Sequence, residues 1–160
     1  MENVGSDSIH EKSIELVIDH FELLEFKRNF IRKDGDEYVC DGQRIRNAKD
    51  ESISVKFKSM EHTYEIFSLM GNVWGDWNGC PDWTVMKQKA KEWYEYYGAE
   101  LTRVAHDTLV FQCKRKLTEN EVETLIKDIS HFAPNSLDFA KHEMIRKNLA
   151  EEGTFVLWWD

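Results

Sequence analysis

Apolar residues recur at helical spacing in residues 82–98, where they are separated by three or four positions. This spacing places them on one face of a helix, with lysines and glutamates on the other. Gly98 is expected to end the helix, because glycine adopts the left-handed conformation after a helix without a Cβ penalty. The pattern therefore predicts a helix over 82–98 and a hairpin that extends to Phe111. The apolar face comprises Trp83, Met86, Ala90, Trp93 and Tyr97.

The same periodicity predicts further helices and strands. Thr118 and Glu121 have the spacing of a capping box, in which a threonine and a glutamate satisfy each other's backbone N–H groups at a helix start. Ile53, Val55 and Phe57 alternate with polar residues, as in a half-buried strand. The expected helices are residues 14–24, 118–132 and 136–152, and the expected strands are 51–59, 63–70 and 154–160. Residues 101–113 are expected to form two strands of a hairpin joined near 105–108, and residues 29–46 short strands or an irregular hairpin.

The order of these elements predicts an α+β fold. Residues 154–160 are too apolar for an exposed sheet edge, so this strand is expected inside the sheet. A two-layer sandwich buries all the apolar faces, with the helices packed on one face of a mostly antiparallel sheet. The length fits one domain over 1–160, of which the polar residues 1–8 are expected to be frayed.

Composition narrows the classes of function. The 160 residues include 30 acidic and 21 basic side chains, for a formal net charge of -9. This charge disfavours direct binding to nucleic acid or to an anionic membrane, and it favours a cationic partner. Cys40, Cys80 and Cys113 match neither a disulfide framework nor a metal knuckle. Without a signal sequence or a long apolar run, the expected location is the cytoplasm.

Three short motifs occur together in the second half of the chain. Residues 97–100 are Tyr-Gly-Ala-Glu, residues 107–109 are Asp-Thr-Leu, and residues 158–160 are Trp-Trp-Asp. This set resembles the bacterial family catalogued as domain of unknown function 4253, over roughly residues 82–160. Ala133-Pro134-Asn135 departs from the Cys-Pro-Asp turn of that family, so no role of its thiol or carboxylate is carried over. The resemblance implies a domain of that family and no activity.

No catalytic, metal or cofactor motif stands out. Asp138 and His142 share a predicted helix face, but a metal site needs further ligands at a suitable spacing. The imidazole of His106 is followed by Asp107, which is equally typical of a turn. Glycines 71, 75 and 79 match neither nucleotide-binding fingerprint. We therefore expect no catalytic residues, no metal and no cofactor.

Tryptophan and aspartate around residues 71–83 provide a candidate binding surface. Tryptophan anchors protein interfaces, and loops often carry function, although packing in the core is the alternative for the tryptophans. The candidate contact residues are Trp74, Asp76, Trp77, Asp82 and Asp160.

These observations predict a non-enzymatic binding protein. The first hypothesis is an immunity or antitoxin-type inhibitor that blocks a cationic, nuclease-like bacterial toxin through its acidic surface. The second is a small-molecule binder or enzyme with a pocket under the Trp-rich loop 71–83. The third is a structural or regulatory homodimer, since the sequence leaves the oligomeric state open.

Overall fold

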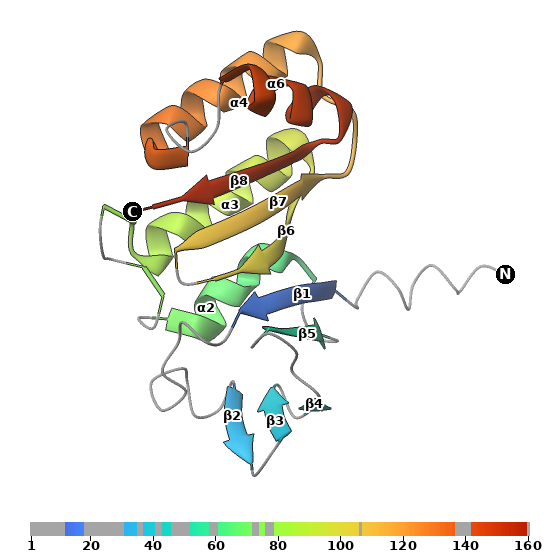
Figure 1. The fold of residues 1–160 in the computed structure, drawn as a ribbon, viewed down its shortest axis with the longest axis vertical. Coiled ribbons are helices and arrows are strands. Elements are labelled where there is room, and N and C mark those ends of the chain that lie inside the picture. Colours follow the sequence, from blue (N-terminus) through green and yellow to red (C-terminus); the bar gives the residue numbers. More distant parts are fainter. Residues whose placement is uncertain are drawn as a thin grey trace, which may run out of the picture.

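A five-stranded sheet forms the centre of the structure. The computed structural model describes residues 12–17, 31–34, 37–40, 43–45, 52–57, 61–71, 74–75, 79–105, 107–136 and 142–159. The strands are β1 (Lys12–Val17), β5 (Ser52–Phe57), β6 (Ala99–Val104), β7 (Thr108–Cys113) and β8 (Thr154–Trp158). Their order is β5-β1-β6-β7-β8, and all neighbours are antiparallel except β1 and β6 (Figure 1).

Helices pack on one face of this sheet, which confirms the predicted α+β class. The long helices are α3 (Trp83–Tyr97), α4 (Glu119–Phe132) and α6 (His142–Glu151). Alternate side chains of β7 and β8 are buried, including Phe111 and Phe155, while Val156 on the other side is exposed. Trp93 of α3 contacts both phenylalanines, so α3 covers the buried face.

A second, smaller sheet confirms the short strands predicted before residue 46. It consists of β2 (Ile31–Asp34), β3 (Glu37–Cys40) and β4 (Gln43–Ile45). Both strand pairs are antiparallel, with order β2-β3-β4. Asp34, the first residue of one Asp-Gly dipeptide, ends β2, and the second dipeptide comes between β3 and β4 in the sequence. Asp-Gly is common where two strands form a hairpin.

The aromatic core is centred on Trp93. Its ring meets Phe111 and Phe155 edge to face, each at a centroid distance of 5.4 Å, and Phe132 of α4 at 5.9 Å. The indole Nε1 donates a hydrogen bond of 2.7 Å to Asp128, which leaves no polar atom of the ring unsatisfied. Burial of each such ring contributes roughly 1.5–3 kcal/mol to folding. This cluster holds α3, α4 and the sheet together.

Helix α3 begins and ends where the sequence predicts. Asp82 is the N-cap, and Gly98 follows the last turn with a φ of 65°. The N–H of Gly98 donates to the carbonyl of Tyr94, which satisfies one of the last carbonyls of the helix. The hairpin of β6 and β7 then starts at once.

Substitution of Gly98 by alanine is expected to lower the free energy of unfolding by about 1 kcal/mol. A Cβ at this position would meet Lys114 only at 3.6 Å, an ordinary contact, so the cost is that of the positive φ. Urea denaturation of the variant measures the change. An unchanged midpoint would contradict the left-handed helix end.

The capping box predicted for α4 is confirmed. Thr118 accepts a hydrogen bond of 3.2 Å from the N–H of Glu121, and the Glu121 carboxylate accepts one of 2.9 Å from the N–H of Thr118. Arg115 also binds this carboxylate. The hydrogen bond from Arg115, followed by that from Thr118, lowers the pKa of Glu121 to about 2.

Two predicted elements are wrong. Lys12–Val17 forms strand β1 instead of the start of a helix; the rest of that predicted helix lies outside the described residues. Ile14 and Leu16 are both buried, two positions apart, because β1 lies between β5 and β6. The predicted strand 63–70 is instead a 3-10 turn, η2 (Thr63–Glu65), and a short helix, α2 (Ile66–Met70). Strand β5 therefore pairs with β1 and forms no hairpin with residues 63–70.

The position of β8 also corrects the sequence prediction. Among the strands that the structure describes, this apolar strand is the last in the sheet and pairs with β7 alone. Helix α6 lies beside it, and Ser136 binds its far end. None of the helices within the described residues is long and apolar enough to cross a membrane.

Candidate functional site: the free edge of strand β8

The structure places Trp74 in the core, which corrects its prediction as a surface contact. Only 1% of the side chain is exposed, and its Nε1 donates a 3.1 Å hydrogen bond to the carbonyl of Ala105. Its ring meets Phe67 and Trp159 edge to face, at centroid distances of 5.1 and 5.8 Å. Packing, the alternative that the sequence left open, therefore accounts for this tryptophan.

The other predicted contact residues have different positions. Asp82 is exposed at the start of α3, where its Oδ1 accepts from the N–H groups of Thr84 and Val85 at 2.9 and 3.0 Å. The hydrogen bond from the Thr84 hydroxyl is the largest cause that lowers the pKa of Asp82. Asp76, Trp77 and Asp160 lie outside the described residues, as do His106 and Asp138.

Replacement of Asp82 by alanine is expected to lower the melting temperature, because two N–H groups lose their acceptor. Asp82→Asn keeps an acceptor and should lower it less. Because the folded-state pKa is lowered, the benefit of the charge is present above pH 4 and declines as the pH falls below it. Thermal melts of both variants at pH 7 and pH 3 test this, and equal melting temperatures for the two at pH 7 would contradict it.

Main-chain groups at the outer edge of β8, on the side away from β7, form the candidate site. The residues that pair with β7 through hydrogen bonds are the odd-numbered ones, as the bonds from Cys113 to Gly153 and from Trp159 to Asp107 indicate. In an antiparallel pair the N–H and C=O groups of alternate residues point away from the partner strand. The groups of Thr154, Val156 and Trp158 therefore point outward.

Ser136 occupies the outward groups at one end of this edge. Its hydroxyl accepts a 2.8 Å hydrogen bond from the N–H of Trp158 and lies 3.5 Å from the Trp158 carbonyl oxygen, to which it donates. A single side chain thus takes the place of one residue of a neighbouring strand. Val156, two positions before Trp158, lies next to this covered end of the strand and lines the groove described next.

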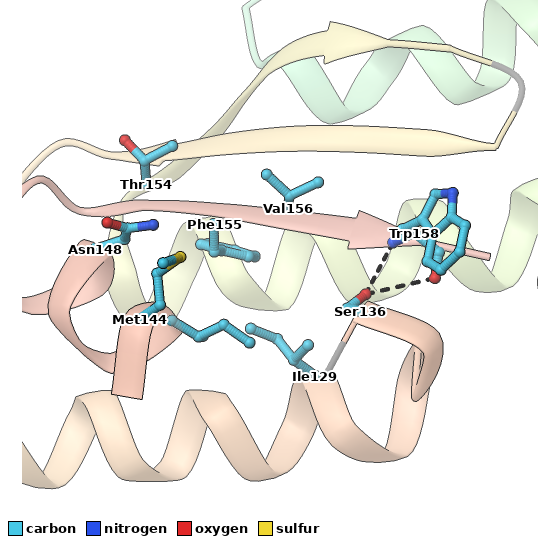
Figure 2. Close-up of a pocket in the computed structure, with 9 residues that line it drawn as sticks. Ile129, Ser136, Met144, Asn148, Thr154, Phe155, Val156 and Trp158 are labelled. Atoms are coloured by element: carbon cyan, nitrogen blue, oxygen red, sulfur yellow. Dashed lines mark hydrogen bonds between the residues drawn. The ribbon is translucent and has the colours of Figure 1, made fainter. Parts of the chain in front are cut away.

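An apolar groove follows the free edge at this point. Figure 2 shows its lining side chains, which come from α4, α6, β8 and Ser136, a residue that follows α4. The space has a volume of about 170 Å³. Met144 and Val156 are exposed by 56% and 40%. The lining residues are Ile129, Ser136, Met144, Ile145, Asn148, Thr154, Phe155, Val156 and Trp158.

The groove offers main-chain hydrogen bonds and apolar contact, and the described residues around it supply no obvious nucleophile or metal site. Burial raises the pKa of the Cys113 thiol to about 11, so this sulfur is protonated and a poor nucleophile at neutral pH. Cys80 is also buried. Within the described parts of the chain, no three His, Cys, Asp or Glu side chains are grouped as a metal site. The arrangement favours binding of an extended chain.

Comparison with protein families identifies residues 57–160 with the model described as Domain of unknown function (DUF4253). The chain belongs to this family. The matched region includes α2, α3, β6, β7, α4, α6 and β8, and hence every side chain that lines the groove. The searches of curated proteins and of solved structures found no match. The family description names no activity, so function is argued from geometry and charge.

Sequence analysis did not find the groove. Its residues are spread from 129 to 158, and no short motif joins them. One signal was available: the strand of residues 154–158 has neither a charge nor a proline, the features that usually protect a sheet edge. The same apolar composition is typical of a central strand, which is the position that the sequence predicts.

Proposed function

We propose that this chain is a non-enzymatic binding protein of the immunity or antitoxin type, which blocks a cationic, nuclease-like toxin by direct contact. The observation that carries the proposal is the outer edge of β8, where the outward groups of Val156 lie beside an apolar groove. An extended segment of a partner can add to such an edge, with main-chain hydrogen bonds for affinity and the groove for side-chain specificity. Ser136 would limit the added strand at Trp158.

The charge of the chain supports a cationic partner. A net charge of -9 attracts a basic protein and increases its association rate. A nuclease has to bind phosphates, so its active-site cleft carries the basic groups that an acidic protein can cover. We place this function in the cytoplasm.

The alternatives have less support. Trp74 and Cys80 are buried, so these two residues of the 71–83 loop contribute to the core and not to a pocket beneath it. A symmetric homodimer that pairs two β8 strands about Val156 would set a second strand opposite Trp158, where Ser136 already lies. Ser136 thus disfavours a homodimer through this edge. The co-purification experiment below distinguishes a homodimer from a complex with a partner.

Co-purification tests the proposal, with a tagged copy of this chain and the product of a neighbouring toxin-like gene that is carried in inactive form. We expect a complex with one copy of this chain and one of the toxin, protection of cells from the active toxin, and weaker binding at high salt. A stable homodimer that captures no cationic protein would contradict the proposal, as would binding that is insensitive to salt.

A further inference from the structure

An aromatic cluster lies on the surface formed by η2 and α3, away from the groove in sequence. The rings of His62 and Tyr64 stack at a centroid distance of 5.1 Å, with their planes 11° apart. Tyr94 of α3 meets His62 at 4.6 Å and Tyr64 at 6.0 Å. All three side chains are half-buried, so each ring keeps part of its surface in contact with solvent.

Three carboxylates, those of Glu61, Glu65 and Glu95, lie near enough to Tyr64 for their charges to act on it. Glu65 is held in place, because its Oε2 accepts hydrogen bonds from the N–H groups of Glu61 and His62 at 3.1 and 2.8 Å. Glu61 and Glu95 are exposed. Partial burial, followed by the charges of Glu65 and Glu95, raises the pKa of Tyr64, and the charge of Glu61 acts in the same direction. The Tyr64 ring therefore lies near negative charge.

In the part of the chain that the structure describes, basic side chains form ion pairs with other carboxylates and not with these. Among the described residues, ion pairs join Lys89 to Glu92 and Asp128, Arg115 to Glu121, Arg146 to Glu123, and Arg103 to Glu15. No ion pair within this part of the chain involves Glu61, Glu65 or Glu95. Lys87 of α3 instead donates to the hydroxyl of Ser68, at 2.7 Å. Within the described residues, the aromatic cluster thus combines partly exposed rings with carboxylates that form no ion pair.

We infer that this cluster receives an arginine side chain of a cationic protein partner, with the guanidinium against the rings of Tyr64 and Tyr94 and its N–H groups directed to Glu61 and Glu95. Cations bind the negative faces of aromatic rings, and the planar guanidinium can stack on a ring while it donates to carboxylates at its edge. The ammonium of lysine is compact and not planar, so it cannot stack on a ring while it donates to carboxylates at the ring edge. The inference rests on the proposed function only in taking the partner to be a cationic protein.

Titration of the full-length chain with a hexa-arginine peptide at low salt tests the inference. The ring ¹H–¹³C resonances of Tyr64 and Tyr94 are followed by NMR, and hexa-lysine is titrated in parallel. We expect the arginine peptide to shift both ring signals and to bind more tightly than the lysine peptide. The double variant Glu61→Gln/Glu95→Gln should raise the Kd about fivefold, because two exposed charge contacts are lost.

The matched control is Glu151→Gln/Glu152→Gln, which removes two exposed charges of the same sign at the end of α6. It should change the Kd much less than the cluster variant. Absence of peptide binding, shifts that avoid the two tyrosines, or equal losses in both double variants would each overturn the inference. Failure of the toxin co-purification with a positive peptide result would reject the proposed function and leave the arginine site intact.

Discussion

Replacement of Trp74 by alanine is expected to lower the free energy of unfolding by about 3–5 kcal/mol, the usual cost when a large buried ring is removed. The indole is 1% exposed and lies between Phe67 and Trp159. Its loss would leave a cavity and remove the hydrogen bond to the carbonyl of Ala105. A loss of this size is a large fraction of the stability of an ordinary domain.

The control for this prediction is Trp74→Phe. It keeps most of the apolar volume but removes the donor to Ala105, so it should cost about 1–3 kcal/mol. Urea denaturation followed by circular dichroism measures both variants. If Trp74→Ala keeps wild-type stability but binds a partner poorly, Trp74 is a surface contact and its assignment to the core is wrong.

Substitution of Gly75 by alanine is expected to cost about 3 kcal/mol. The φ of this residue is +89°, and an added Cβ would lie 2.4 Å from the carbonyl oxygen of Pro81, an overlap with backbone that no side-chain rotation relieves. The positive φ alone costs about 1–2 kcal/mol, and overpacking adds a similar amount. Gly75 also forms an isolated bridge with Asp82, so the overlap would disturb the residues that lead into α3.

Gly79 provides a control within the same loop. Its φ is +80°, yet an added Cβ would meet no atom within 4 Å. Gly79→Ala should therefore cost only about 1–2 kcal/mol, the part due to the backbone conformation. The difference between the melting temperatures of the two variants isolates the steric overlap. Equal melting temperatures would show that Gly75 and Pro81 are not in close contact.

Helix α3 shows why local patterns predicted part of the fold well. Asp82 satisfies the first N–H groups, Gly98 ends the last turn, and the apolar stripe between them includes Met86 and Trp93. Each of these signals acts over a few residues, so sequence alone contains it. The capping box of Thr118 and Glu121 is local in the same way.

Strand β1 shows where local patterns fail. Ile14 and Leu16 satisfy a strand period, but apolar residues at 17, 18, 21 and 24 also fit a helix period. Pairing with β5 on one side and β6 on the other decides between them, and those partners lie about 40 and 90 residues away. A single sequence does not specify such contacts.

Residues 63–70 contain a helix signal that their apolar composition obscures. Ile66, Phe67 and Met70 are buried and have the spacing of one helix face. The run is apolar enough to resemble a central strand, and its shortness hides the helical period. The buried Thr63 then contributes a hydroxyl that accepts from the N–H of Leu101 and donates to Glu100.

Identification of the candidate site requires the tertiary structure, whereas helices such as α3 can be predicted from local sequence. Sequence directed attention to Trp74 and Asp82, and the structure places these in the core and at a helix N-cap. The free edge of β8 becomes a site only because Ser136 covers one end of it and α6 lies beside it. Tryptophan and aspartate content gave no information about that arrangement.

Proline at position 156 gives the most direct test of the proposed binding edge. The N–H of Val156 points away from β7, so Val156→Pro removes a donor from the edge without loss of a hydrogen bond within the sheet. Val156→Thr keeps the donor and serves as the control. Isothermal titration calorimetry with the co-purified cationic partner is expected to show about a tenfold weaker Kd for the proline variant and a Kd close to wild type for the threonine variant. Wild-type affinity in a folded Val156→Pro protein would contradict binding at the β8 edge.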